Sequence, residues 1–203
     1  MRKITVFMSM TLDGVIQSPG GPDEDPSGGF QHGGWAAPYF DSVMGEMAES
    51  NRTGVGAILL GRFTYEALYA YWPTAPQPNQ FTDVLNNSPK YVASRTLSEP
   101  LPWMNSTLLQ GDAADAVPKL KAEDGPDLVV LGSAGLVQTL LRHDLVDDWV
   151  LQIHPLVLGS GKRLFPDGAP TSTFTLADTV NTTTGVIIAT YRRADQAVAG
   201  RHV

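Results

Sequence analysis

Cysteine is absent from this sequence of 203 residues. Its absence excludes disulfides, thiolate ligands for zinc and a cysteine nucleophile. Long apolar runs are absent as well, because the strongest ones, residues 57–60 and 128–131, fall far short of the roughly 20 residues that cross a bilayer. The sequence therefore predicts no membrane partner.

Positive charge is also scarce in this chain. Lysine and arginine together number 14 against 21 aspartates and glutamates, which gives a formal net charge of -7. Because nucleic-acid binding depends on cationic contacts with phosphates, nucleic acid is not predicted as the main partner. Met1-Arg2-Lys3 leads directly into a short apolar run without the longer run and cleavage site of an export signal, so we expect a cytoplasmic protein.

Short apolar runs alternate with helical segments along the chain, which is typical of βα units and a largely parallel sheet. Several runs are continuous rather than alternating, as in strands buried on both faces. We expect strands at residues 4–8, 57–60, 90–93, 106–109, 128–131, 149–154 and 185–191. Amphipathic spacing predicts helices at residues 38–50, 64–71, 112–122 and 134–143. No helical pattern separates the last two strands, so they should pair antiparallel at the sheet edge.

Two segments lack any regular pattern. Residues 17–34 are rich in glycine, proline and acids, which predicts a long mobile loop that is either functional or disordered. Residues 194–203 are small and polar, which predicts a frayed tail. The length is sufficient for one hydrophobic core, so residues 1–193 are expected to form a single domain.

Two expected strands run directly into a glycine and then a helix. The first junction contains Gly61 and Arg62, and the second contains Gly132 and Gly135. Such a junction presents unpaired backbone N–H groups and the positive end of the helix dipole, which together can hold a phosphate. Plain βα turns are the alternative. The second junction is not a G-x-G-x-x-G fingerprint, so a standard Rossmann fold is not supported.

A third strand end carries a hydroxyl and a guanidinium. Ser94 and Arg95 follow the strand at residues 90–93, at the edge where open α/β sheets bind ligands. Arg95 beside Arg62 would suit a 2′-phosphate through charge-assisted hydrogen bonds. The alternative for Arg95 is a solvated surface side chain.

Five motifs in this order resemble the dihydrofolate-reductase-like superfamily, and within it the group containing the C-terminal reductase domain of riboflavin biosynthesis. The resemblance covers roughly residues 2–193. The motifs are S-x-T-L-D-G at 9–14, G-R-x-T-Y-E at 61–66, P-K-Y-V-A-S-R-T-L at 89–97, V-L-G-S-A-G-L at 130–136 and P-L-V-L-G-S-G-K-R-L-F at 155–165.

The resemblance implies a three-layer α/β sandwich with an eight-stranded, mostly parallel sheet, an antiparallel C-terminal edge and NADPH lying across the strand ends. It also implies a homodimer. Asp13 and Gly14 would lie in the loop that covers nicotinamide and substrate. The cofactor-binding positions that it implies are Gly61, Arg62, Thr64, Ser94, Arg95, Gly132, Ser133, Ala134, Gly135 and Leu136.

The chain departs from two members of that superfamily. Dihydrofolate reductases proper carry a carboxylate on the first helix that binds the pterin ring, and the spacing of Asp41, Glu46 and Glu49 to Gly61 does not match it cleanly. Aminouracil ribosyl phosphate reductases are usually joined to a deaminase with zinc-binding His and Cys motifs, which this chain lacks.

We expect hydride transfer from NADPH to a flat pterin-, flavin- or pyrimidine-like small molecule. Trp35, Tyr39 and Phe40 are candidates to contact that ring, with core packing as the alternative, favoured for Phe40. Asp13, or water ordered by it, is the first candidate for the proton source and Asp41 the second. An aspartate before glycine is also a common turn former, so Asp13 could instead shape the loop.

Three alternatives remain open at the level of sequence. The chain could be an aminouracil ribosyl phosphate reductase, a non-catalytic protein that binds NADPH and senses a ligand, or an interaction scaffold without NADPH affinity. The four histidines are scattered through the sequence, so no metal site is predicted.

Overall fold

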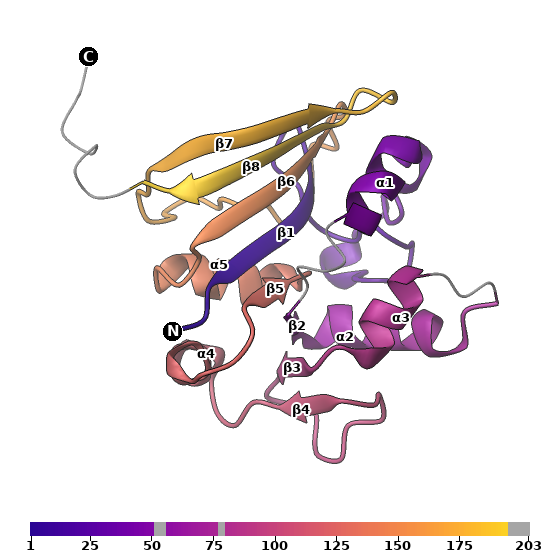
Figure 1. Cartoon of the computed structure of the whole chain (residues 1–203). Helices are drawn as coiled ribbons and strands as arrows, with labels where there is room; N and C mark the ends of the chain where they lie inside the picture. Colours follow the sequence, from indigo (N-terminus) through magenta and orange to yellow (C-terminus); the bar gives the residue numbers. More distant parts are fainter. Residues whose placement is uncertain (51–55, 77–79, 195–203) are drawn as a thin grey trace.

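The computed structural model describes residues 1–50, 56–76 and 80–194. They contain one eight-stranded sheet in the order β4-β3-β2-β5-β1-β6-β8-β7 (Figure 1). The first six strands of this order are parallel, whereas β8 is antiparallel to β6 and β7 is antiparallel to β8. The predicted sheet and its antiparallel edge are confirmed. The strands are β1 (Ile4–Thr11), β2 (Ala57–Gly61), β3 (Lys90–Ala93), β4 (Ser106–Leu108), β5 (Leu128–Val130), β6 (Asp148–His154), β7 (Phe174–Asn181) and β8 (Ile187–Arg193).

Helices cover both faces of the sheet, as Figure 1 shows. The α4/α5 face packs into a large apolar core with β1, β2, β5 and β6. On the opposite face, a second core joins β2 and β3 to α2 and α3, and a third, smaller one joins α1 to β6 and β8. The α-helices are α1 (Ser42–Ser50), α2 (Arg62–Tyr71), α3 (Gln80–Asn87), α4 (Ala113–Ala122) and α5 (Ala134–Arg142), and short 3-10 turns lie at Ser27–Gly29, Ala37–Tyr39 and Trp72–Thr74.

The first helix begins later than its apolar spacing predicts. A 3-10 turn, Ala37–Tyr39, precedes it, and the extended Phe40 separates that turn from α1. Phe40 is 67% exposed, so its expected core packing is wrong. The physical reason is that the break in the helix takes Phe40 off the face that Met44 presents to β8.

Two elements were not predicted from the sequence. Strand β7 lies at the edge of the sheet, and most of its side chains are exposed, so it carries little of the apolar pattern that marks a strand. Helix α3 follows a proline-rich segment and contains one buried apolar residue, Leu85, among its described side chains. In both cases neighbouring elements, rather than a strong local pattern, stabilise the structure.

The loop at residues 17–34 is held in place, contrary to the expected mobility. The buried Gln17 side chain donates to the backbone carbonyl oxygens of Asp25 and Ser27, at 2.8 and 2.9 Å, and the backbone carbonyl of Gln17 accepts from the Trp35 indole. Lys162 Nζ lies 2.6 Å from an Asp25 carboxylate oxygen. These bonds fix the conformation of a loop whose glycine-rich composition does not by itself favour one conformation.

Three other expectations concern the tail, membranes and metals. All of the predicted tail except Ala194 lies outside the described residues. No helix in the described ranges has the length and apolar character needed to span a bilayer. Across the same ranges, no three histidine, aspartate or glutamate side chains gather where a metal ion could bind.

Candidate active site

The carboxyl edge of the parallel strands gathers most of the predicted site residues. Asp13 follows β1, Gly61 ends β2, Ser94 follows β3, and Gly132 follows β5. These four strands are neighbours in the order β3-β2-β5-β1, so the junctions line one edge of the sheet. The two glycine junctions are therefore adjacent, not scattered over the molecule.

The β2–α2 and β5–α5 junctions touch each other directly. The Gly61 amide donates to the Gly132 carbonyl at 3.0 Å, and the Thr64 amide donates to Ser133 Oγ at 3.1 Å. A Cβ added to Gly61 would lie 2.7 Å from Ser133 Oγ, and one added to Gly132 would lie 2.5 Å from Thr64 Oγ1. Both glycines thus allow the two junctions to approach closely. The Gly61 N–H donates to the Gly132 carbonyl, so it is not one of the unpaired N–H groups expected at this junction.

Of the two helix starts at this edge, the first turn of α5 has N–H donors that are more available than those of α2. Its N-cap, Ser133, makes no side-chain capping hydrogen bond. The first N–H groups of a helix have no partners within it, and they carry the positive end of the helix dipole. A Cβ added to Gly135 would meet nothing within 4 Å, so open space borders this turn. Ala134, Gly135 and Leu136 are the residues best placed to hold an anion through their backbone.

A hollow that is partly open to solvent lies beside these junctions. The loop at residues 17–34 contributes two acids to its lining, Glu24 and Asp25. Burial would raise the pKa of Asp25, but hydrogen bonds from Lys162 and Ser27 outweigh burial and hold that pKa below its usual value. Burial raises the pKa of Glu24. The lining comprises Met8, Ile16, Gln17, Ser18, Pro19, Glu24, Asp25, Phe63, Thr64, Leu131, Gly132, Ser133 and Ala134.

Arg62 and Arg95 lie at the carboxyl ends of adjacent strands. Arg62 forms an ion pair with Glu66 at 3.1 Å and stacks over the Phe63 ring, with Cζ 4.4 Å from the ring centroid. The Arg95 side chain is 84% exposed, and its closest anionic partner, Asp112, is 3.9 Å away. Both guanidinium groups are accessible to an anionic ligand. Ser94 Oγ accepts hydrogen bonds from the amides of the following turn, so this side chain shapes the turn that carries Arg95.

The two candidate proton donors, Asp13 and Asp41, both have structural partners. Asp13 accepts from Thr11 Oγ1 at 2.6 Å and from the Gly159 amide at 2.8 Å, which ties the β1 loop to the loop after β6. The hydrogen bond from Thr11 is the main cause that lowers the pKa of Asp13. Asp41 accepts from both the amide and the hydroxyl of Thr183, and the hydroxyl is the main cause of its lowered pKa. The geometry favours loop shaping over proton donation for both.

Trp35 and Tyr39 enclose a histidine that sequence reasoning left unassigned. His154, the last residue of β6, is fully buried, and neither ring nitrogen has a hydrogen-bond partner among the described residues. Its ring lies edge-to-face with Trp35 and Tyr39, at centroid distances of 5.1 and 5.4 Å. Burial lowers the pKa of His154 to about 4. Trp35 is therefore a core residue, Tyr39 is half-buried beside the site, and Phe40 points into solvent.

A strip of the sheet between α1 and the α2/α3 pair is not covered by any apolar core. Phe7 of β1 and Val129 of β5 are only partly buried although they lie on central strands, and neither belongs to any of the three cores. On the same face, Ser9 Oγ lies 2.9 Å from Gln152 Oε1 of β6. Sequence reasoning missed this pair. Its only signal was Gln152 itself, a polar residue within an otherwise apolar strand.

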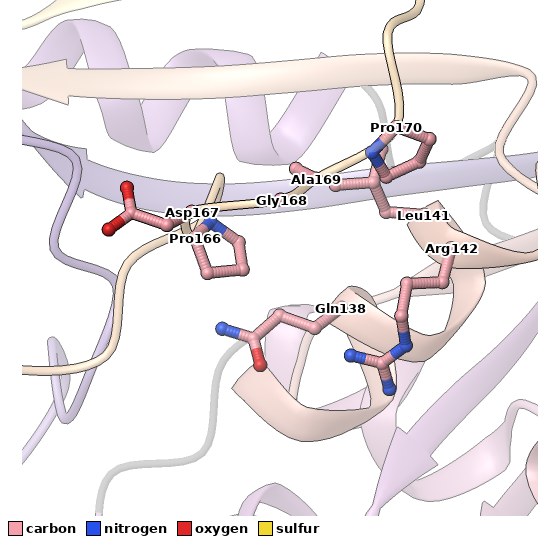
Figure 2. Close-up of a pocket in the computed structure, with 8 residues that line it drawn as sticks. All are labelled: Gln138, Leu141, Arg142, Pro166, Asp167, Gly168, Ala169 and Pro170. Atoms are coloured by element: carbon pink, nitrogen blue, oxygen red, sulfur yellow. The ribbon is translucent and has the colours of Figure 1, made fainter.

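A second hollow, of about 280 Å³, lies at the far end of α5 from its first turn. Figure 2 shows the residues of this helix and of the loop at residues 166–170 that line it. None of the predicted site residues lines it. The sites predicted from the sequence belong instead to the carboxyl edge of the sheet.

The fold and the site place the protein among the dihydrofolate-reductase-like proteins. The model of the RibD C-terminal domain matches residues 2–188, so the chain belongs to that family. The chain is 30% identical to the protein YyaP of Bacillus subtilis (strain 168) over 196 residues, 94% of each chain. It is 26% identical to YwjB of the same organism over 168 residues, 81% of this chain and 83% of YwjB.

Three solved structures share the fold. A putative riboflavin biosynthesis protein from Shewanella sp. PV-4 aligns with a TM-score of 0.66 and 22% identity, over 95% of this chain and 99% of its own. A pyrimidine reductase-like protein from Corynebacterium diphtheriae aligns with a TM-score of 0.66 and 14% identity, over 96% and 93%. Dihydrofolate reductase from Enterococcus faecalis, complexed with NADP(H), aligns with a TM-score of 0.58 and 14% identity, over 95% and 97%.

Proposed function

We propose that the protein is an NADPH-dependent reductase that acts on a flat heterocyclic substrate. The proposal depends on what lies along the carboxyl edge of the sheet. Two glycine junctions, the first turn of α5 without a side-chain cap and two accessible arginines lie along this edge, next to the strip that contains Phe7. Membership of the RibD C-terminal domain family supports a reductase-like function. The NADP(H) bound by the similar dihydrofolate reductase supports the choice of cofactor.

The residues at the sheet edge would divide the cofactor between them. The first turn of α5 would hold the pyrophosphate through backbone amides, since anions bind at uncapped helix N-termini. Arg62 and Arg95 would hold the 2′-phosphate through charge-assisted hydrogen bonds. Thr64 and Ser133 would keep the two junctions together at the distance that this binding needs.

NADPH would supply the hydride, and the protein would supply orientation and a site from which water is partly excluded. The substrate would lie on the strip that contains Phe7, beside the carboxyl edge. The lowered pKa values of Asp13 and Asp41 keep both carboxyl groups ionised near neutral pH. We therefore propose that solvent water, and not either aspartic acid, delivers the proton that completes reduction of a C=N or C=C bond.

Titration of NADPH and NADH fluorescence tests the cofactor proposal. We expect the wild-type protein to bind NADPH at least tenfold more tightly than NADH, because only NADPH carries the 2′-phosphate. The double variant Arg62→Ala/Arg95→Ala should lose at least tenfold in NADPH affinity, given about 1.5–3 kcal/mol for a hydrogen bond to a charged group, and should change little in NADH affinity. Arg142→Ala, an exposed arginine on α5 outside the site, is the matched control.

Three results would contradict this proposal. Equal affinity for the two nucleotides, unaffected by the double variant, would remove the arginines from the site. Loss of NADPH affinity in Arg142→Ala to the same extent would show a nonspecific effect of charge. NADPH binding without oxidation by any heterocyclic acceptor would favour the non-catalytic, ligand-sensing alternative.

A further inference from the structure

We infer that Glu24 binds a proton together with the cofactor: it becomes protonated when the pyrophosphate of a dinucleotide binds beside it, so that cofactor affinity falls as pH rises. Glu24 lines the hollow beside the glycine junctions, together with Ser133 and Ala134 at the start of α5. The inference rests on the proposed function, which places the pyrophosphate at that first turn. It adds a titratable group to a site that otherwise binds through amides and arginines.

Glu24 is the acid of this hollow that lacks a cation. Among the residues that line the hollow, Glu24 and Asp25 are the titratable ones. Asp25 is paired with Lys162 at 2.6 Å, so their charges compensate each other. Glu24 accepts from the Gly20 amide at 2.8 Å, but none of the ion pairs within the described residues includes it. An anion that enters the hollow therefore meets one uncompensated carboxylate.

The cations near the hollow already have acidic partners. Phe63 lines the hollow, and both Arg62 and Lys162 lie over its ring, with Cζ and Nζ at 4.4 and 5.4 Å from the centroid. Arg62 is paired with Glu66 of the same helix at 3.1 Å, as Lys162 is with its own acid in the loop. Strand β1 and helix α5 contribute no charged side chain to the lining. The charge of Glu24 is thus left uncompensated from every side of the hollow.

A second negative charge in this partly buried space favours the protonated acid. Burial raises the pKa of Glu24 even without a ligand, and the charge of Asp25 adds to this effect. A pyrophosphate brings further negative charge, and a nearby like charge disfavours the ionised form of a carboxylic acid. The pKa of Glu24 should therefore be higher in the complex than in the free protein. Protonation removes the repulsion and leaves a carbonyl oxygen that still accepts from the Gly20 amide.

The direction of the pH dependence follows from this difference in pKa. A group whose pKa rises on binding takes up protons from solution when the ligand binds. Below both pKa values of Glu24 the cofactor meets a neutral acid, and affinity is highest. Between the two values affinity falls with rising pH, and above both the cofactor meets a carboxylate and affinity is lowest.

Isothermal titration calorimetry with NADPH and with NADH, from pH 5 to pH 8, tests the inference. Titrations in two buffers of different ionisation enthalpy give the number of protons taken up. NADH carries the pyrophosphate but lacks the 2′-phosphate, whose own deprotonation would strengthen binding to the arginines. With both nucleotides we expect wild-type protein to take up more protons than Glu24→Gln, by up to about one proton. Glu24→Gln should bind both nucleotides about tenfold more tightly at pH 8, and this gain should diminish towards pH 5.

Glu24→Gln is a conservative variant, because its amide oxygen can still accept from the Gly20 amide. Glu123→Gln, which changes an exposed acid at the end of α4, is the matched control and should leave affinity and proton uptake as in wild type. Thermal unfolding establishes that each variant is folded. Glu24→Ala is the second variant if Glu24→Gln does not fold, and it should show the same decrease in proton uptake.

The outcomes separate this inference from the proposed function. Equal proton uptake in wild type and a folded Glu24 variant overturns the inference alone, even if NADPH is strongly preferred. Weaker binding by Glu24→Gln at pH 8 also overturns it, because the carboxylate would then attract the cofactor. Lower proton uptake in the variant with equal affinity for NADPH and NADH supports the inference while the roles of the arginines fail. If wild-type protein binds neither nucleotide, both proposals are overturned.

Discussion

Because His154 is buried, the free energy of unfolding depends on pH between about pH 4 and pH 6.5. Its imidazole is fully buried between Trp35 and Tyr39 without a hydrogen-bond partner among the described residues. Burial disfavours the charged form, which lowers the pKa from 6.5 to about 4 in the folded protein. The unfolded chain therefore binds more protons than the folded one between these values, and stability must fall as pH falls through the window.

The magnitude follows from the two pKa values. Each unit of difference corresponds to about 1.4 kcal/mol, so the full loss, reached below pH 4, is about 3 kcal/mol. Between pH 7 and pH 5, integration of the same linkage relation gives a loss of about 2 kcal/mol. Asp13, Asp25 and Asp41 have pKa values below 3.8, so they remain ionised at pH 5 and do not contribute to this loss.

Urea unfolding at pH 7 and pH 5, followed by tryptophan fluorescence, measures the effect. His154→Phe keeps an aromatic ring in the site and removes the titrating group, so its loss of stability between the two pH values should be smaller by about 2 kcal/mol than that of wild type. His143→Gln removes an exposed histidine and should behave as wild type. Equal losses in wild type and His154→Phe would refute the reasoning, because they would mean that the folded protein solvates His154.

Two further predictions concern contacts that hold the site together. Gly61→Ala should destabilise the protein by about 1–3 kcal/mol in urea unfolding, because the added Cβ would clash with Ser133. Gly135→Ala, whose Cβ meets open space, is the control and should be close to neutral. Equal effects of the two substitutions would contradict the close contact between the two junctions. Lys162→Met should lower the free energy of unfolding by about 2 kcal/mol, because it leaves the buried Asp25 carboxylate without its cation. Adding Asp25→Asn should recover part of this loss. A double variant no more stable than the single one would disprove the pairing.

The strand ends and the helix that follows each of them were predictable because their signals are local. Ala57–Gly61 is a continuous apolar run that ends in glycine, and its partner junction at Gly132 has the same pattern. Once such runs are parallel neighbours in one sheet, their carboxyl ends must share an edge. This is why Gly61, Arg62, Ser94, Arg95 and the 132–136 segment all lie at the carboxyl ends of neighbouring strands.

The roles of individual site residues were less predictable, because they depend on partners far away in the sequence. Gly61 was expected to bind the cofactor, yet the space beside its Cα is filled by Ser133. Asp13 and Asp41 were interpreted as acids, yet each is bonded to a loop more than 140 residues away. The Ser9–Gln152 pair spans 143 residues. No local pattern carries such information.

The sequence by itself determined the order of the strands and helices other than β7 and α3, the absence of cysteine chemistry, and the two glycine junctions, because periodicity and composition act over a few neighbouring residues. Only the tertiary structure decided that the Gly61 amide is bonded to Gly132, that the glycine-rich loop is fixed by Gln17 and Lys162, and that Phe7 and Val129 on central strands stay outside the apolar cores. These properties arise from packing between segments that are distant in the chain, and packing is settled only when all of the layers are in place.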